Sequence, residues 1–194
     1  MSENNYLELA ELGVRVRALR KEKGWTLAEV SKRSGLAIST ISKIERAEIS
    51  PTYDRFLQLA VGLGVEMNTL FSPNTGALPT DCEVTVTRAG EAIHHETERY
   101  VYEILCGDKP SKAMTPMLGL VKAHSIKPLE DLIRHQGEEF IYLMEGKLEL
   151  HMKDREPLRM SQGDAAYFDS ALDHAYVSAG ESDAKILVVC VDRL

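Results

Sequence analysis

The chain has 194 residues, enough for one domain or two, and carries 23 Lys and Arg against 30 Asp and Glu. This acidic balance argues against a protein that binds nucleic acid over its whole surface. The balance is uneven, because residues 1–71 carry 10 basic and 9 acidic side chains (10 − 9 = +1) and residues 72–194 carry 13 and 21 (13 − 21 = −8). Any contact of the first part with phosphate must therefore be local.

The cysteines and the apolar runs predict a soluble cytoplasmic protein without membrane contact. Cys82, Cys106 and Cys190 are widely spaced and form no Cys-x-x-Cys pair, which excludes a disulfide framework and a zinc finger. We interpret them as reduced thiols of a cytosolic interior. The sequence has no N-terminal signal pattern, and its longest apolar run, residues 186–191, is too short to span a bilayer.

Helical periodicity characterises residues 1–71. Residues 7–23 place leucines and a valine on one side of a first helix, which Gly24 ends. Two shorter helices follow, and the pattern then predicts a fourth helix ending at Gly64 and a short fifth helix over residues 65–71. Five small helices around one apolar core suit a domain of this size.

The two shorter helices lie between Thr26 and Pro51 and are joined by a tight turn at Gly35. Thr26 stands three residues before Glu29, which is the spacing of a capping box at a helix start. The second of these helices begins near Ser39, another oxygen-bearing cap. Its inward face is formed by isoleucines three residues apart: Ile38, Ile41 and Ile44. Small hydroxyls and cations remain on its outer face, a pattern typical of a helix-turn-helix whose second helix reads DNA.

This stretch resembles the helix-turn-helix of the phage Cro and C1 repressor family, and the resemblance runs over about residues 12–71. It rests on several segments in register: Leu19-Arg20, Thr26-Leu27-Ala28-Glu29, the segment from Ser39 to Arg46, Ser50-Pro51 and residues 59–65. The resemblance implies a domain that binds a double-stranded DNA operator. Leu27 stands where family members commonly carry Gln, so the operator sequence does not follow from it.

In this motif the N-terminal end of the second helix enters the major groove. We therefore expect Ser39, Thr40 and Lys43 to contact base edges, because hydroxyls and amines pair with groove acceptors. Phosphate contacts, which fix register without reading sequence, are expected from four further side chains: Thr26, Arg33, Ser42 and Arg46. Two alternatives stay open, in which Ser39 acts only as a helix cap and Lys43 is solvated surface.

Turn-forming residues over 72–81 indicate a linker, and from residue 82 the periodicity changes to short alternating runs. Eight runs are strand candidates without helices between them: residues 83–88, 100–105, 116–123, 139–144, 147–152, 165–168, 174–178 and 185–191. This pattern predicts an all-β sandwich or small barrel of the jelly-roll kind over residues 82–194. The chain is thus expected to contain two domains, one all-α and one all-β.

Two segments of the second domain, residues 135–146 and 163–174, resemble the two signature motifs of the cupin family, whose fold is a double-stranded β-helix. In the first motif His135 precedes Glu139 by four residues, and His174 takes the ligand position of the second motif. Ile133 stands where the family has the first histidine of its His-x-His pair. The family's four-ligand metal site is therefore excluded, and a three-ligand site remains.

The resemblance implies that His135, Glu139 and His174 hold one divalent metal ion, which would be iron, manganese or zinc with open coordination positions. The alternative is a polar cluster in which the two imidazoles hydrogen-bond to Glu139 without a metal. The residues leave both interpretations open.

A β-barrel interior offers a pocket for a small-molecule effector. Its expected lining consists of aromatic and methionine side chains from several strands, namely Tyr102, Phe140, Tyr142, Met144, Tyr167 and Tyr176. Because side chains alternate along a strand, only about half of such a list can point inward.

The two resemblances together predict a DNA-binding transcriptional regulator, not an enzyme, whose cupin domain binds an effector and modulates operator affinity. A homodimer is expected, because one reading helix covers few base pairs and a site made of two half-sites needs two DNA-binding domains.

The alternative is an enzyme, since a helix-turn-helix fused to a cupin also occurs in hydroxypropylphosphonate epoxidase, a mononuclear non-haem iron oxidase. The resemblance implies that the metal trio matches its iron ligands and Tyr102 a substrate-site tyrosine. Gly24 and Leu132, however, replace its catalytic lysine and a polar substrate-binding side chain. The outer face of the reading helix, which an enzyme does not need, favours the regulator.

Overall fold

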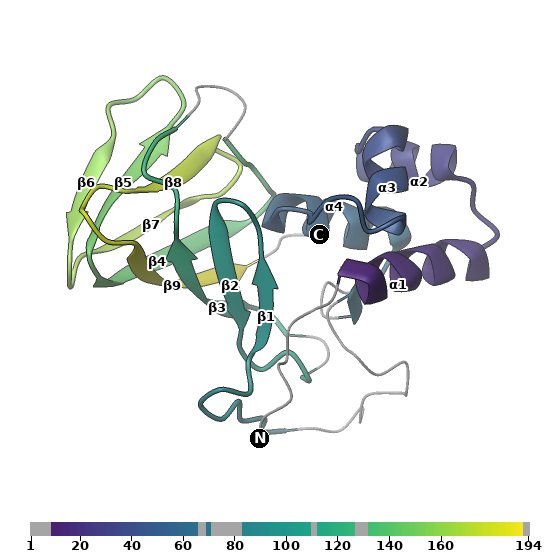
Figure 1. The fold of residues 1–194 in the computed structure, drawn as a ribbon, viewed down its shortest axis with the longest axis horizontal. Helices are drawn as coiled ribbons and strands as arrows, with labels where there is room; N and C mark the ends of the chain where they lie inside the picture. The colour runs from purple at the N-terminus through teal and green to yellow at the C-terminus, as the bar shows by residue number, and fades with distance from the viewer. Residues whose placement is uncertain (1–8, 66–68, 71–82, 110–111, 127–131, 192–194) are drawn as a thin grey trace. The chain divides into compact units, whose positions relative to one another are not determined.

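The computed structural model describes residues 9–65, 69–70, 83–109, 112–126 and 132–191 (Figure 1). The chain divides into two compact units, of which one contains residues 1–93 with 106–111 and the other residues 94–105 with 112–194. The linker expected over residues 72–81 lies outside the described residues, so that boundary stays a prediction.

The described part of the first unit contains four helices: α1 (Leu9–Glu22), α2 (Leu27–Ser34), α3 (Ile38–Glu45) and α4 (Tyr53–Leu63). Five helices were expected and four have described bounds. Of the expected fifth, over residues 65–71, the described residues 69 and 70 are helical and most of the others lie outside the described residues. Local chemistry sets the helix ends. Thr26 caps α2 in a capping box with Glu29, and Gly35 and Gly64 end α2 and α4 with left-handed φ angles of 75° and 61°.

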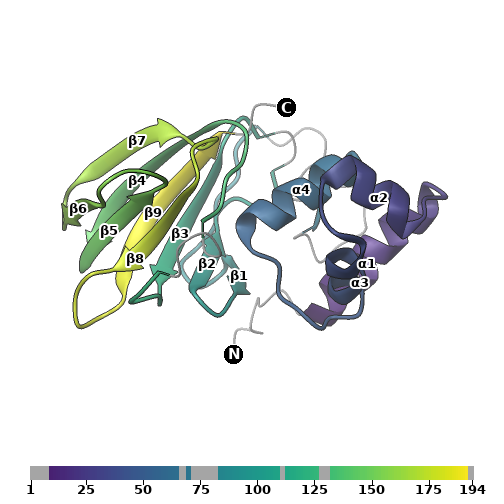
Figure 2. The same ribbon diagram turned by 90° about the horizontal axis from the view of Figure 1, so that it is seen from above.

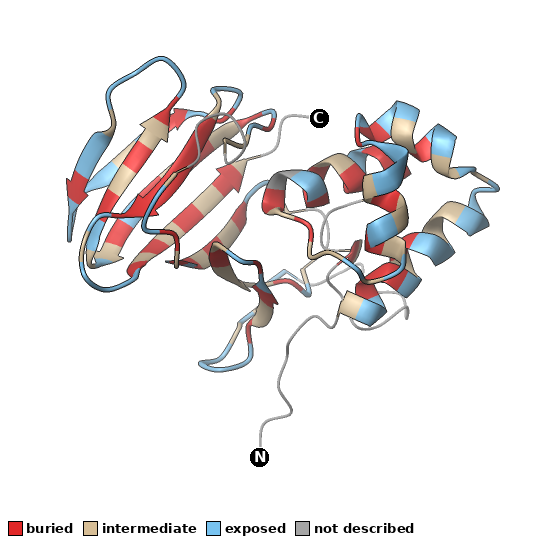
Figure 3. Ribbon diagram, turned by 45° about the horizontal axis from the view of Figure 1, so that its top comes forward, coloured by how far each residue is buried: buried red, intermediate tan, exposed pale blue. Residues whose placement is uncertain are grey.

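Apolar side chains from all four helices form the core of this unit, and Figure 3 marks the buried positions along each helix. The core side chains include Leu12, Val16, Val30, Ile41, Ile44, Phe56, Leu59 and Leu63. Ile38 was expected on the inward face of α3 but is 48% exposed. Each step of three residues falls about 60° short of a full helical turn, so Ile38 drifts out of the face that Ile41 and Ile44 share.

Two glycines allow the helices to approach each other closely. A Cβ atom at Gly13 of α1 would lie 2.8 Å from the carbonyl oxygen of Ile44 in α3. A Cβ atom at Gly62 of α4 would lie 2.5 Å from the Cβ atom of Ser34 in α2. Both distances are shorter than van der Waals contact, so the α1–α3 and α2–α4 crossings depend on glycine.

The second unit consists of two sheets, a six-stranded sheet in the order β1-β2-β3-β9-β4-β7 and a three-stranded sheet in the order β6-β5-β8 (Figure 2). The strands are β1 (Ile93–Glu96), β2 (Tyr100–Ile104), β3 (Thr115–Val121), β4 (Glu138–Glu145), β5 (Lys147–Met152), β6 (Leu158–Ser161), β7 (Ala165–Asp169), β8 (His174–Ser178) and β9 (Ala184–Val191). The hydroxyl of Tyr100 in β2 donates to the carbonyl oxygen of Tyr176 in β8 over 3.0 Å and so links the two sheets. This two-sheet architecture agrees with the predicted all-β cupin-type domain.

Seven strands, β2 to β5 and β7 to β9, agree with predicted runs, whose ends lie within two residues of the observed ones. The strands β1 and β6 were not predicted. The strand predicted over residues 83–88 is wrong, since this segment is not a strand. Its polar side chains bond to a turn instead, because the Thr85 hydroxyl donates to Asp108 over 2.6 Å and the Thr87 hydroxyl accepts from the Cys106 N–H over 2.7 Å. Alternation alone does not supply a neighbouring strand with which to pair.

We expect the substitution Gly13→Ala to destabilise the helical unit by about 1–3 kcal/mol, because the added methyl group would collide with the backbone of α3. Urea unfolding followed by helical circular dichroism measures the change. Val14→Ala, at a position of the same helix that is 68% exposed, is the matched control and should change stability by less than about 0.5 kcal/mol. Equal stability of Gly13→Ala and the wild type would contradict this close approach.

Candidate functional site

One face of α3 carries the side chains expected to contact bases. Ser39 and Lys43 are exposed, and Thr40 is half-buried between them. The N-cap of α3 is Ala37, which makes no side-chain cap bond. The alternative that Ser39 caps this helix is therefore wrong, and its hydroxyl lies in the first turn on the exposed side.

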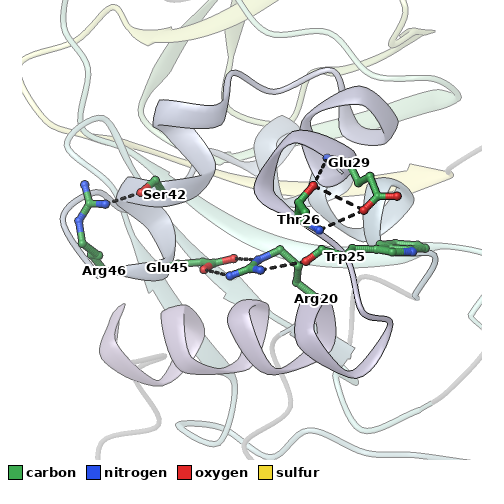
Figure 4. Close-up of polar contacts among 7 residues, drawn as sticks. All are labelled: Arg20, Trp25, Thr26, Glu29, Ser42, Glu45 and Arg46. Atoms are coloured by element: carbon green, nitrogen blue, oxygen red, sulfur yellow. Dashed lines mark hydrogen bonds and ion pairs between the residues drawn. The ribbon is translucent and has the colours of Figure 1, made fainter.

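A bidentate ion pair attaches the other end of α3 to α1 (Figure 4). Arg20 donates from Nε and Nη2 to the two carboxylate oxygens of Glu45 over 2.6 and 2.7 Å. Its Nη1 donates to the carbonyl oxygen of Trp25 over 3.0 Å, just before α2 begins. The two charged side chains are only 13% and 7% exposed, and their hydrogen bonds raise the pKa of Arg20. The pair thus fixes α3 relative to α1 and the start of α2.

Two of the side chains expected to contact phosphate already have partners within the helical unit. The Thr26 hydroxyl accepts from the Glu29 N–H over 3.2 Å, and the Thr26 N–H donates to the Glu29 carboxylate over 3.1 Å (Figure 4). The guanidinium carbon of Arg33 lies 4.1 Å from the ring centroid of Trp25, and the Lys23 amine lies 5.3 Å from it. Trp25 therefore holds two cations beside α2 by cation–π attraction.

The other two, Ser42 and Arg46, are joined to each other. Arg46 donates to the Ser42 hydroxyl (Figure 4) and also makes a two-pronged ion pair with Glu48, with distances of 2.6 and 3.0 Å. The sequence analysis missed Glu48. A DNA phosphate must displace the Glu48 carboxylate before it can accept hydrogen bonds from both of these Arg46 donors.

In the cupin unit, the three predicted metal ligands lie together in the interior. His135 Nε2 is 3.0 Å and His174 Nε2 is 3.5 Å from the same oxygen of Glu139, Oε2. All three side chains are buried. The Tyr176 hydroxyl donates to the other Glu139 oxygen, and burial together with the adjacent carboxylate raises the pKa of this tyrosine well above its ordinary value. The prediction that these positions converge is consistent with this geometry.

The hydrogen bonds of His174 define which nitrogen faces Glu139. Its Nδ1 lies 2.7 Å from the carbonyl oxygen of Leu172, and since a carbonyl only accepts, Nδ1 must donate. In the neutral ring Nε2 is then an acceptor, and it faces the Oε2 acceptor of Glu139. A metal ion bound between these two atoms would be coordinated by both of them.

The donor set fits a divalent metal ion. Burial acts to raise the pKa of Glu139, but the interactions with His135 and His174 outweigh it and lower this pKa to about 2. The group is therefore a carboxylate at neutral pH. Two imidazole nitrogens and a carboxylate oxygen suit iron, manganese or zinc, and such an ion would supply Lewis acidity to a further ligand.

Cys190 is a potential ligand that the sequence analysis missed. Among the described residues, ligand atoms of His135, Glu139 and Cys190 all lie within 4.8 Å of one another, and all three residues are buried. The sequence could have indicated this position, because side chains alternate strictly along β9. Cys190 therefore points to the same side as the apolar residues Ile186 and Val188.

The side chains expected to line an effector pocket do not share one interior. Tyr176 is buried, and Tyr102 lies on the same side of β2 as the buried Tyr100. Phe140 and Tyr142 alternate with the buried Glu139 and therefore point to the opposite side of β4, where Tyr142 is 40% exposed. Tyr167 pairs with Phe140 across β4 and β7 and is 65% exposed. Met144 is half-buried beside a register shift.

This distribution corrects the predicted pocket. Because Glu139 points inward, strand alternation sends its neighbour Phe140 and then Tyr142 outward. Only Tyr102 and Tyr176 of the predicted lining remain on the side of the predicted metal-ligand trio.

None of the described helices has the length and apolar character that a membrane-spanning segment requires.

Comparison with known proteins identifies both units. The family described as helix-turn-helix matches residues 16–70, and the family described as cupin domain matches residues 125–190. The HTH-type transcriptional regulator SutR of Escherichia coli (strain K12) is 33% identical over 69 residues, which cover 36% of this chain but only 39% of SutR. The HTH-type transcriptional regulator PuuR of the same organism is 19% identical over 175 residues, or 90% of this chain and 91% of PuuR.

Solved structures agree with the two-domain fold. An HTH_3 family transcriptional regulator from Vibrio cholerae superimposes with a TM-score of 0.68 at 17% identity, covering 97% of this chain and 98% of that one. Hydroxypropylphosphonic acid epoxidase from S. wedmorenis gives a TM-score of 0.47 at 21% identity over 94% and 98% of the two chains, a likeness too weak to carry an argument. The chain belongs to the Cro/C1-type, or XRE-type, helix-turn-helix transcriptional regulators and carries a C-terminal cupin domain.

Proposed function

We propose that this regulator binds a specific DNA operator through α3 and that its cupin domain binds a small-molecule effector that modulates operator affinity. The observation that carries the proposal is the face of α3 with the exposed Ser39 and Lys43, on a helix whose last residue is held by the Arg20–Glu45 ion pair. A reading helix must present its side chains in a defined orientation, because base contacts discriminate only with good geometry.

Within this proposal, Ser39 and Lys43 contact base edges and Thr40 stands beside them at the groove. Ser39 lies in the first turn of α3 and Lys43 one turn further on, so both project from the exposed part of the helix. Arg46, Arg33, Ser42 and Thr26 contribute phosphate contacts that fix the register. Because residues 1–71 have a formal charge of only +1 (10 − 9), these few contacts carry most of the attraction to DNA.

The proposed assembly is a homodimer on a pair of half-sites. One α3 covers few base pairs, and two of them about one DNA turn apart read a longer site. The excess of acidic groups over residues 72–194, with a formal charge of −8 (13 − 21), keeps the cupin domain away from the DNA backbone.

The cupin domain is the proposed sensor, with His135, Glu139 and His174 holding one divalent ion. The buried carboxylate and the two imidazoles facing its Oε2 atom support this role. An effector that binds better to one arrangement of the dimer than to another shifts the population toward that arrangement. The effector then changes the free energy of operator binding by as much as the operator changes the free energy of effector binding.

A second candidate function, an iron-dependent oxidase, is favoured by the same convergence of two histidines and one carboxylate. Against it, Leu132 supplies no polar group beside His135 for an anionic substrate. The exposed polar face of α3 also has no role in such an enzyme.

We expect Lys43→Ala to weaken specific operator binding by about 1–3 kcal/mol, because it removes a base contact. An operator is first selected from a pool of randomised duplexes with the full-length protein, and affinities are then measured by fluorescence anisotropy. Lys153→Ala, which removes the same charge from the cupin domain, is the matched control and should leave the affinity unchanged. Unaltered binding by Lys43→Ala would remove this residue from the proposed interface.

We expect Arg46→Ala to weaken binding to all DNA sequences alike, because it removes a phosphate contact. The slope of the logarithm of affinity against the logarithm of salt concentration should become smaller by about one. The slope of binding against salt concentration on operator and random duplexes measures both effects. A loss confined to the operator would instead make Arg46 a base-reading residue.

We expect the double substitution His135→Ala and His174→Ala to abolish stoichiometric retention of a divalent metal that the wild-type protein retains after desalting. Elemental analysis by plasma mass spectrometry gives the metal content. His151→Ala is the matched control, since this histidine bonds to Glu149 over 3.1 Å, outside the trio. Metal retained by the double variant would refute the ligand set.

We expect the iron(II)-loaded protein to consume no oxygen in the presence of hydroxypropylphosphonate, measured with an oxygen electrode. The reason is the missing polar group at Leu132. Oxygen uptake that depends on the phosphonate and is lost in Glu139→Gln would instead establish the oxidase as the function of the cupin domain.

A further inference from the structure

Cys190 lies directly beside the metal-ligand trio. It is 1% exposed and belongs to β9, whose residues Ala184, Ile186, Val188 and Cys190 point into the domain. In the register of β4 and β9, Cys190 is the cross-strand partner of Glu139. Both side chains point to the same face of the sheet, so the thiol and the carboxylate are neighbours.

The distances allow the sulfur to share an ion with His135 and Glu139, whereas His174 does not lie within the same distance of all three. Ligand atoms of His135, Glu139 and Cys190 lie within 4.8 Å of one another. Ligand atoms about 2.0–2.3 Å from a zinc ion are at most about 4.6 Å apart, so small side-chain movements bring all three into coordination range. The fourth group, His174, approaches Glu139 Oε2 to 3.5 Å, and its buried Nε2 makes no hydrogen bond to any described residue.

The chain lacks one ligand of the family's metal site. Ile133 takes the place of the first histidine of the cupin motif and offers only an apolar side chain. The backbone of Ile133 pairs with that of His174, with N–H to oxygen distances of 2.8 and 2.9 Å, so this segment still borders the cluster. One donor is missing from the segment before β4, and one sulfur is present on the adjoining strand β9.

We propose that the Cys190 thiolate is a fourth protein ligand of the cupin metal site, together with His135, Glu139 and His174. When the ion binds, the sulfur–hydrogen bond breaks, the proton leaves to solvent and a metal–sulfur bond forms. This proposal deepens the proposed function, because it rests on a metal in the cupin domain.

The sulfur ligand determines which metal the site takes. Thiolate is a soft donor, and a set of two imidazoles, one thiolate and one carboxylate suits zinc, whereas iron and manganese sites favour nitrogen and oxygen donors. Four protein ligands also fill the tetrahedral shell that zinc prefers in structural sites. Such a site leaves no position for oxygen or substrate, so the proposal selects a metal-dependent regulator over the oxidase.

Cobalt(II) substitution tests the proposal, because a thiolate bonded to cobalt gives a near-ultraviolet charge-transfer band that nitrogen and oxygen ligands do not give. The full-length protein is stripped of metal, kept reduced with a phosphine and titrated with cobalt(II). The expected result is one equivalent of bound cobalt with this band and with the intense visible bands of tetrahedral coordination. Binding without the band, or no binding, would overturn the proposal.

Two variants assign the band to Cys190. Cys190→Ser should lose the band and bind cobalt at least about tenfold more weakly, since removing a ligand costs at least as much as disturbing its surroundings. The double variant Cys82→Ser and Cys106→Ser leaves Cys190 as the only thiol and should keep the band, so assignment remains possible where Cys190→Ser does not fold. A band that persists in folded Cys190→Ser, or disappears in the double variant, contradicts the assignment.

The operator-binding assay is run on the same samples and separates this proposal from the proposed function. DNA binding with a cobalt spectrum that lacks the sulfur band removes Cys190 as a ligand and leaves the regulator intact. A sulfur band in a protein that selects no DNA sequence would support the metal site and refute operator binding.

Discussion

The orientation of α3, the proposed reading helix, depends on the ion pair between Arg20 and Glu45. Glu45 is the last residue of α3, where the partial negative charge of the helix end disfavours a carboxylate. Its near-complete burial makes an unpaired charge costly as well. Both penalties are offset by one planar guanidinium that uses two donors on Glu45 and a third on the Trp25 carbonyl. Gly13 permits this arrangement, since it lets α1 approach the backbone of α3.

A buried carboxylate organises the cupin unit too, but with different consequences. Both oxygens of Glu45 accept from one rigid guanidinium, which suits a structural role. Glu139 is instead surrounded by separate side chains, of which Tyr176 only donates while His135 and His174 are also able to bind metal. The same chemical group is therefore held by one guanidinium in the helical unit and by several separate side chains in the cupin unit.

Local signals in the sequence predicted the helices and most strands, because capping, glycine stops and side-chain alternation act over a few residues. The capping box of Thr26 and the left-handed Gly35 are examples. Contacts between distant residues were not accessible in this way. The pairing of Glu139 with Cys190 depends on β9 lying between β3 and β4, an order that no local pattern encodes.

The wrong pocket residues have a more specific origin. The predicted pocket took the aromatic and methionine side chains of β4, yet the buried set of this strand is Glu139, Ile141 and Leu143. The cost of burying this carboxylate is offset by the hydrogen bonds that it accepts, and a hydropathy scale does not include them.

The near-neutral charge of the helical unit determines where operator selectivity must arise. Sequence-independent binding grows with the number of phosphates neutralised, and residues 1–71 have a formal charge of only +1 (10 − 9). Glu48 weakens this sequence-independent binding further, because its carboxylate already accepts two hydrogen bonds from the guanidinium of Arg46 at the end of α3. With a weak general attraction to DNA, the ratio of specific to non-specific binding depends on the few base contacts that α3 offers. The proposed operator recognition therefore relies on the orientation that Arg20 and Glu45 impose more than on charge.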